Sequence, residues 1–171
     1  MDLSIPFQGL KEGNHQYQFS IGNKFFEAFP EGDVHQGNLE VSVDLTKRST
    51  GLETVFSIHG KVTVACDRCL DDLEMDIDYE GKLYFEYGQE TQEVTDELIM
   101  ISASQNSLEL DQYIYEFIVL SLPIQKFHPN DAKGKTLCNQ EMLDKLNTLY
   151  RNNEEDEIVD PRWDKLKDLI N

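Results

Sequence analysis

The chain has 171 residues, with 33 Asp and Glu against 15 Lys and Arg, so its formal net charge is −18. Hydrophobic residues make up 39% of it and aromatic residues 10%, which is enough for a packed core and excludes a disordered chain. The cations are scattered, whereas nucleic-acid-binding proteins present a basic stripe, so the composition disfavours direct binding to a phosphate backbone. No apolar run is long enough to span a bilayer and no secretory signal opens the sequence. Three cysteines are too few for a disulfide scaffold and fit a reducing cytoplasm.

Two-residue alternation of apolar and polar side chains dominates the first half of the chain and predicts half-buried antiparallel strands. Gly60 lies inside one alternating segment, where we expect the strand to bend or bulge. A short helix is expected over residues 23–29, ended by Pro30. Long bent strands predict an α+β fold with a strongly curved, barrel-like antiparallel sheet. The alternating segments are residues 3–7, 17–21, 39–45, 56–66 and 73–87.

Helical periodicity replaces the alternation in the second half. Residues 110–122 predict a helix that is apolar nearly all round and is therefore buried. Asp111 is its expected N-cap and Pro123 ends it. Residues 142–150 predict a second helix that is more amphipathic.

The end of the chain predicts a separate element. Residues 152–157 are acidic and lack periodicity, which is typical of a linker, and the Asp-Pro pair at 160–161 opens a last helix. Trp163 on that helix would either dock it on the sheet or anchor a partner protein. We therefore expect one α+β domain over residues 1–150, containing one buried helix, with two helices in the C-terminal region. Residues 151–171 would form the linker and a loosely attached terminal helix.

The sharpest local feature is Cys66-Asp67-Arg68-Cys69, at the turn between two predicted strands. Thiolates three residues apart on a tight turn can both bind one Zn²⁺ in a zinc knuckle. His128 and Cys138 would complete a structural set of three Cys and one His, although their spacing exceeds the usual interval, so the fold must bring the pairs together. An unmetallated hairpin with buried thiols and a redox dithiol are the alternatives.

Catalytic motifs are missing from the sequence. It contains no nucleophile elbow, phosphate-binding glycine loop, zinc-protease helix or dinucleotide fingerprint. We therefore expect no enzymatic activity and no small-molecule substrate. A metal-dependent hydrolase built on the cysteine cluster is the remaining enzymatic alternative, and it requires an open coordination position beside a general base.

Four segments, in this order, resemble one known family: residues 64–70 (VACDRCL), 116–123 (EFIVLSLP), 128–138 and 160–163 (DPRW). The family is the bacterial YceD family, whose members are called large ribosomal RNA subunit accumulation proteins. Cys66, Arg68 and Cys69 match its C-x-R-C core, and Glu116 and Pro123 match the end of its helix. The resemblance implies a non-enzymatic, cytoplasmic role in making or accumulating the RNA of the large ribosomal subunit, and it carries over no catalytic residue.

The position of Glu116 within an apolar helix leads to a structural expectation. A buried carboxylate needs a partner, and we expect it to pair with Arg68, so that the thiol turn lies against the helix. Arg68, Glu116 and Trp163 are the candidate partner-binding residues.

An acidic surface speeds encounter with a basic protein, so a basic ribosomal or rRNA-processing protein is the expected partner. Acidity that serves only solubility is the alternative. Direct RNA binding is a further alternative, and it would require Lys126, Lys133, Lys135 and Arg68 to gather on one face.

Overall fold

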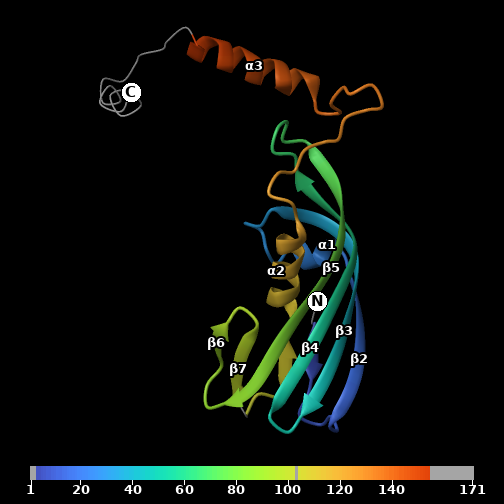
Figure 1. The fold of residues 1–171 in the computed structure, drawn as a ribbon, viewed down its shortest axis with the longest axis vertical. Coiled ribbons are helices and arrows are strands. Elements are labelled where there is room, and N and C mark those ends of the chain that lie inside the picture. Colours follow the sequence, from blue (N-terminus) through green and yellow to red (C-terminus); the bar gives the residue numbers. More distant parts are fainter. Residues whose placement is uncertain (1–2, 103, 155–171) are drawn as a thin grey trace, which may run out of the picture. The chain divides into compact units, whose positions relative to one another are not determined.

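The computed structural model describes residues 3–102 and 104–154, with side chains described as far as residue 149. The chain forms two compact units, residues 1–126 (unit 1) and residues 127–171 (unit 2). Unit 1 contains strands β1 to β8 and helices α1 and α2, and unit 2 contains helix α3 (Figure 1). The predicted mixed α+β architecture, made mostly of sheet, is confirmed.

The centre of unit 1 is a six-stranded sheet in the order β2-β3-β4-β5-β7-β6. Strands β2 to β5 are consecutive antiparallel neighbours, and they correspond to the four long alternating segments of the sequence. Strand β7 pairs with β5 in parallel, and β6 pairs with β7 in antiparallel fashion. The strands are β2 (Gly13–Ile21), β3 (Val34–Arg48), β4 (Gly51–Ala65), β5 (Asp72–Gly88), β6 (Gln92–Thr95) and β7 (Leu98–Ser102).

The predicted barrel-like curvature is wrong, because the sheet is neither closed nor strongly curled. Its edge strands, β2 and β6, do not pair with each other within the described residues. Strand β1 (Ser4–Pro6) does not join this sheet and pairs instead with β8 (Ser107–Glu109). Alternation shows which side chains share a face of a strand, but it does not determine whether the two edge strands meet.

Gly60 lies within β4 and does not interrupt the pairing of the strand. Its φ of 145° lies in the region that glycine tolerates best, and a Cβ at this position would stand 2.3 Å from the Asn38 carbonyl oxygen. The residue nevertheless stays in register with Leu39 on one side and Ile77 on the other. A shift in the β3–β4 register occurs instead between Val34 and Gln36. The expected bulge at Gly60 is therefore wrong, although glycine is required there.

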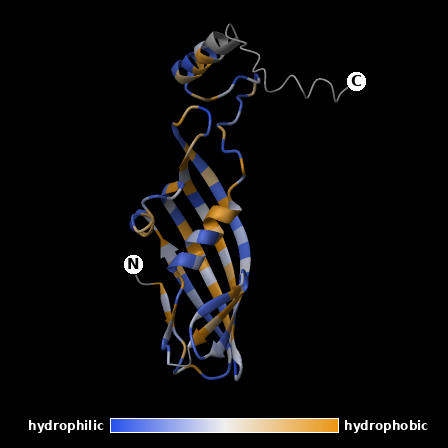
Figure 2. Ribbon diagram, turned by 90° about the vertical axis from the view of Figure 1, so that its left-hand side faces the viewer, coloured by the Kyte–Doolittle hydropathy of each residue, from blue (hydrophilic) through white to orange (hydrophobic). Residues whose placement is uncertain are grey.

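One face of the sheet is buried, as the alternation predicts, and helix α2 (Asp111–Ser121) packs against it (Figure 2). The Phe117 ring centroid lies 5.2 Å from that of Phe56 on β4 and 5.3 Å from that of Tyr79 on β5. These contacts fix the helix to the middle of the sheet. The buried side chains of the central strands include Leu39, Val41, Val43, Leu45, Phe56, Ile58, Val62, Val64, Ile77, Leu83 and Phe85.

Helix α2 is buried on one side only, which corrects the expectation of a helix buried all round. Ile114, Phe117 and Ile118 are buried, whereas Glu116 is exposed and 69% of Leu120 is accessible. The apolar composition of the helix does not reveal whether a second layer covers its outer side. The N-cap is Leu110 rather than Asp111, which is the first helical residue, and no side chain caps the helix.

Two further segments contact strand β3, namely helix α1 (Asn23–Phe26) and the loop that follows β1. Helix α1 lies within the predicted 23–29 segment, and Phe29, just beyond the helix, stacks on Tyr115 of α2 with ring centroids 4.0 Å apart. The Lys47 ammonium group donates hydrogen bonds to the carbonyl oxygens of Phe7, Gln8 and Leu10. This side chain therefore fixes the loop that follows β1 to strand β3.

Unit 2 begins with a loop and continues as helix α3 (Gln140–Glu154). Asn139 caps this helix, because its side-chain oxygen accepts a hydrogen bond from the Glu141 backbone N–H at 3.0 Å. The predicted helix over 142–150 is confirmed, but α3 extends to Glu154 and so includes the start of the expected linker. The rest of that linker and the terminal helix with Trp163 lie outside the described residues, so the domain boundary at residue 150 stays a prediction.

Candidate functional site

The turn between β4 and β5 carries the two closely spaced cysteines. Cys66 follows the last residue of β4, and its backbone N–H donates to the Asp71 carbonyl oxygen at 2.9 Å. The Leu70 N–H donates back to the Cys66 carbonyl oxygen at 2.9 Å. Leu70 is left with a φ of 63°, a costly conformation for a side chain with a Cβ. These two backbone hydrogen bonds therefore close the turn that carries Cys66 and Cys69.

The chain segment that follows α2 is hydrogen-bonded to this turn. The Asp67 N–H donates to the Lys126 carbonyl oxygen at 2.8 Å, and the Lys126 N–H donates to Asp67 Oδ2 at 2.6 Å. The Lys126 ammonium group lies 3.7 Å from Asp67 Oδ1 and 3.4 Å from Asp33 Oδ2. The sequence predicted that the thiol turn lies against the helix that ends at Pro123, and these bonds hold the turn to the segment just beyond that residue.

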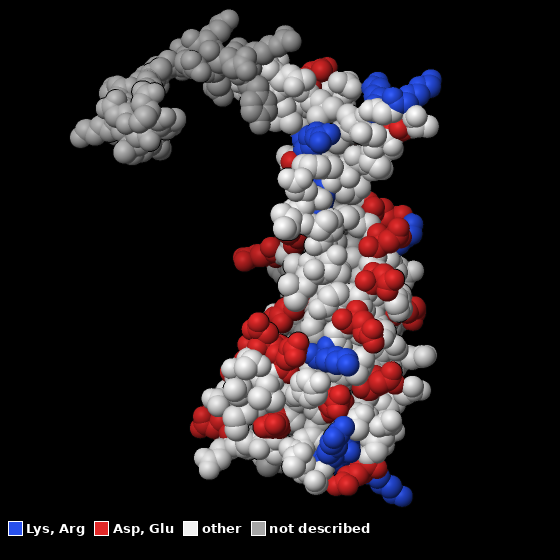
Figure 3. Space-filling view, in the orientation of Figure 1, with Lys and Arg blue, Asp and Glu red and all other residues white. Residues whose placement is uncertain are grey.

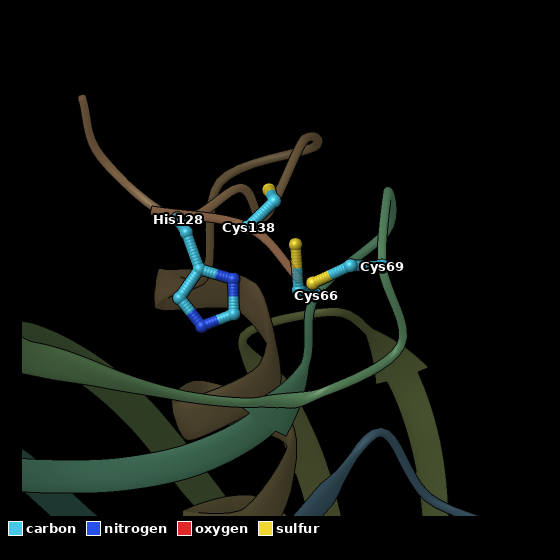
Figure 4. Close-up of side chains that lie close together, drawn as sticks. All are labelled: Cys66, Cys69, His128 and Cys138. Carbon is cyan, nitrogen blue, oxygen red and sulfur yellow. The ribbon is translucent and has the colours of Figure 1, made fainter. Parts of the chain in front are cut away.

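The four predicted metal ligands form one cluster. One ligand atom from each of Cys66, Cys69, His128 and Cys138 lies within 4.8 Å of all the others (Figure 4). The three cysteines are buried thiols rather than partners in a disulfide, and His128 is half-buried. Soft sulfur donors together with an imidazole are ligands that bind transition metals, so this cluster can hold a metal ion.

The expected pairing of Arg68 with Glu116 is wrong, because its premise fails. Glu116 is exposed rather than buried, and its carboxylate accepts a hydrogen bond from Gln112 Nε2 at 2.7 Å. No ion pair between Arg68 and Glu116 occurs in the described part of unit 1. The sequence showed that Glu116 has apolar neighbours along the helix, but not that it faces away from the sheet. Trp163 lies outside the described residues.

The proposed local basic patch would draw on Lys126, which is half-buried between two carboxylates, as described above. In unit 2, Lys133 and Lys135 lie on a turn closed by Asp131, whose Oδ1 accepts both of their backbone N–H groups at 2.8 Å. Two carboxylates therefore lie beside the Lys126 ammonium group, and the Asp131 carboxylate binds the backbone of Lys133 and Lys135.

The outer face of the sheet carries most of the polar side chains of β3 to β5. On β5 the outward positions alternate with the buried ones and include a series of carboxylates (Figure 3). His59 and Asp78 pair across β4 and β5 at 3.0 Å, and Lys61 pairs with Glu74. The exposed carboxylates of this face include Glu40, Asp44, Asp72, Glu74, Asp76, Asp78, Glu80 and Glu86.

A sequence model of one family matches residues 55–170, about two thirds of the chain, and its description is "Large ribosomal RNA subunit accumulation protein YceD". The chain belongs to the YceD family. The match confirms the resemblance seen in the sequence, and it spans all four residues of the cysteine–histidine cluster as well as α2. Strands β1 to β3 precede the matched segment of this YceD family member.

Neither the curated proteins nor the solved structures contain a significant match to the chain. Helices α1 to α3 are each too short or too polar to cross a lipid bilayer. The description of the matching family indicates that its members are involved in accumulating the RNA of the large ribosomal subunit.

Proposed function

We propose that this YceD family member is a non-enzymatic accessory factor in the accumulation of large-subunit ribosomal RNA. It acts by binding a basic ribosomal or rRNA-processing protein through the carboxylates on the surface of unit 1. Its proposed place of action is the cytoplasm, where the ribosomal RNA of bacteria is made and assembled. The family match supports the first part of the proposal, and the distribution of charge supports the second.

The observation that carries the proposal is the excess of exposed carboxylates that have no cationic neighbour. Asp44 and Glu86 on the outer sheet face are exposed, and neither occurs in an ion pair of the described side chains. Such charges raise the local potential and accelerate association with a cationic protein. The same potential repels a phosphate backbone, and the carboxylates beside Lys126 weaken the case for direct RNA binding.

We further propose that the cysteine–histidine cluster binds a structural zinc ion. Around tetrahedral Zn²⁺, donor atoms lie about 3.8 Å apart. The four donor atoms of this cluster already lie within 4.8 Å of one another, so small side-chain rotations suffice. A zinc ion bound there would hold the Cys66–Cys69 turn and residues 128–138 together.

The same donor set argues against a hydrolytic metal. Catalytic zinc sites keep a coordination position open for water, whereas three thiolates and one imidazole fill all four positions. The donors of this cluster are those of structural sites. This supports a scaffold role for the metal and weakens the hydrolase alternative.

The experiment combines deletion of the gene with complementation by charge variants. The test variant neutralises six exposed carboxylates: Asp44→Asn, Asp76→Asn, Glu86→Gln, Glu93→Gln, Asp96→Asn and Glu116→Gln. The matched control exchanges Asp for Glu and Glu for Asp at the same positions, which alters shape but conserves charge. We expect deletion to lower the ratio of large-subunit to small-subunit rRNA, with the control restoring the ratio and the neutralised variant failing to do so.

Purification of the tagged full-length protein at moderate salt tests the partner. A basic ribosomal or rRNA-processing protein should co-purify with the control and be depleted from the neutralised variant. An unchanged rRNA ratio on deletion, or retention of the wild-type protein on RNA without a protein partner, contradicts the proposal.

A further inference from the structure

An open groove lies in unit 1 between α2 and the edge of the sheet formed by β5, β6 and β7. Two adjoining cavities of about 480 and 490 Å³ form it, and Asp96, Phe117 and Leu120 line both. Strand β7 pairs with β5 only from Tyr84 onward, and the second cavity lies beside the preceding β5 residues, Tyr79 to Lys82. We call this the α2 groove.

The floor of the α2 groove is apolar and aromatic. Phe117 and Tyr113 of α2 lie along it, and the Tyr113 ring meets Phe85 edge-on with centroids 5.9 Å apart. Leu120 lines both cavities with 69% of its surface accessible, so it adds exposed apolar surface next to Phe117. The floor therefore offers apolar surface that an incoming side chain would bury.

The rim of the α2 groove is acidic. Its carboxylates are exposed, and none of them takes part in an ion pair of the described side chains of unit 1. One cation, Lys82, lies among the residues that line the two cavities. Burial first, and then the charges of Glu93 and Glu116, raise the pKa of Tyr113 above its ordinary value, which indicates that both carboxylates act on the groove floor. The rim carboxylates are Glu80, Glu93, Asp96, Glu97 and Glu116.

The apolar floor and the acidic rim together determine which kind of ligand fits the α2 groove. A nucleic acid would bring its phosphates against the rim carboxylates, and a neutral apolar ligand would leave those charges without a counterpart. A peptide with Lys or Arg beside an apolar or aromatic residue satisfies both parts: its ring or alkyl group covers Leu120 and Phe117, and its cations reach the rim.

We propose that the α2 groove is the docking site for a cationic peptide segment with an apolar anchor, contributed by the basic protein partner. This rests on the proposed function and adds to it the place of contact. The outer sheet face then contributes long-range attraction, and the groove provides the specific contact.

The test measures binding of a dye-labelled synthetic peptide, rich in Arg and Lys around one central phenylalanine, to the full-length protein. Two control peptides replace the phenylalanine by serine or all the cations by glutamate. The groove variant carries Glu93→Gln, Asp96→Asn and Glu116→Gln. Its matched control, the sheet variant, carries Asp44→Asn, Asp76→Asn and Glu86→Gln, which make the same change in net charge elsewhere on unit 1. A separate variant, Leu120→Ser, tests the floor.

We expect the groove variant to weaken binding about tenfold, since each exposed charge contributes modestly. The sheet variant should weaken it no more than about twofold, because screening reduces distant charges. Leu120→Ser should lower the affinity for the phenylalanine peptide to that of the serine peptide. Equal losses in the two charge variants, or equal affinity for the phenylalanine and serine peptides, would overturn the proposal.

A further outcome separates this proposal from the proposed function. If the natural partner co-purifies equally with the groove variant and the wild type, the groove is not its docking site although the proposed function stands. If no basic partner co-purifies with the wild type, the proposed function fails first. Self-association of the wild type that Leu120→Ser abolishes would assign the groove to a second copy of this chain and likewise overturn the proposal.

Discussion

Replacing Gly81 with alanine would add a methyl group between two aromatic rings. A Cβ at this position would stand 2.9 Å from Tyr79 Cε1 and 3.0 Å from Phe117 Cζ, both closer than carbon atoms pack. Overpacking of this kind costs about 1–3 kcal/mol. The same substitution restricts the unfolded chain and thereby stabilises the protein by about 0.4–1 kcal/mol. The net expectation is a loss of about 1 kcal/mol in the free energy of unfolding.

Removing the ring of Phe117 should reverse the sign of this effect. Phe117→Ala alone costs about 3 kcal/mol, because the ring is buried against Phe56 and Tyr79. In that background the Gly81 methyl group fills vacated space, and Tyr79 can rotate away, so Gly81→Ala should be neutral or stabilising by about 0.5 kcal/mol. The coupling between the two sites would then be about 1–1.5 kcal/mol.

Urea denaturation of the full-length wild type, the two single variants and the double variant measures this cycle. Gly9→Ala is the control, because no heavy atom lies within 4 Å of the position a Cβ would take there. It should be neutral or slightly stabilising in both backgrounds. If Gly81→Ala destabilised the protein equally with and without Phe117, the steric account of this glycine would be refuted.

Three further expectations concern the Lys47 side chain, the cysteine–histidine cluster and the α2 groove. Lys47→Met should lower the free energy of unfolding by about 2 kcal/mol, because the carbonyl oxygens of residues 7–10 lose a charged donor; urea denaturation measures this, and an unchanged midpoint would contradict it. Cys69→Ser should reduce bound zinc from about one equivalent per chain to a small fraction and should lower the melting temperature. Elemental analysis and thermal melting measure these two effects, and equal metal content in both proteins would contradict the zinc assignment. The folded-state pKa of Tyr113 is raised, so the stability that this side chain contributes is present below pH 10 and is lost as the pH rises through the raised pKa. Neutralising Glu93 and Glu116 should lower this pKa but not return it to its ordinary value, because the burial of the side chain remains. Absorbance titration of the wild type and the groove variant checks this, and identical curves would contradict the geometry of the rim.

The long strands could be predicted from the sequence because each has one solvent-exposed and one buried face. Apolar and polar residues therefore alternate along the strand, as from Leu39 to Leu45. The grouping of Cys66, Cys69, His128 and Cys138 could be predicted from their residue types, since three Cys and one His make a complete structural zinc set, even though the spacing between His128 and Cys138 is unusual. Both predictions depend on chemistry that is local to a segment or intrinsic to a side chain.

The parts that could not be predicted depend on long-range arrangement. Strand β7 is short and pairs in parallel with β5, and no period reveals the partner of such a strand. Glu116 was expected to be buried because its neighbours are apolar, but a helix with one covered side exposes every residue on the other. The α2 groove was missed for the same reason, because it exists only where the helix and the uncovered edge of β5 face each other.

The position of the family match within the fold has a practical consequence for fragments of this protein. The match begins at Val55, inside β4, so a polypeptide cut to the matched residues would lose the strand that pairs with β4 along its whole length and the strand that pairs with β8. Its remaining β4 would present bare backbone N–H and C=O groups along the edge where β3 pairs in the full chain, next to the apolar side chains of Phe56, Ile58, Val62 and Val64. Such a fragment should aggregate edge to edge, so the residues that the family model matches are not expected to form this fold without β1 to β3.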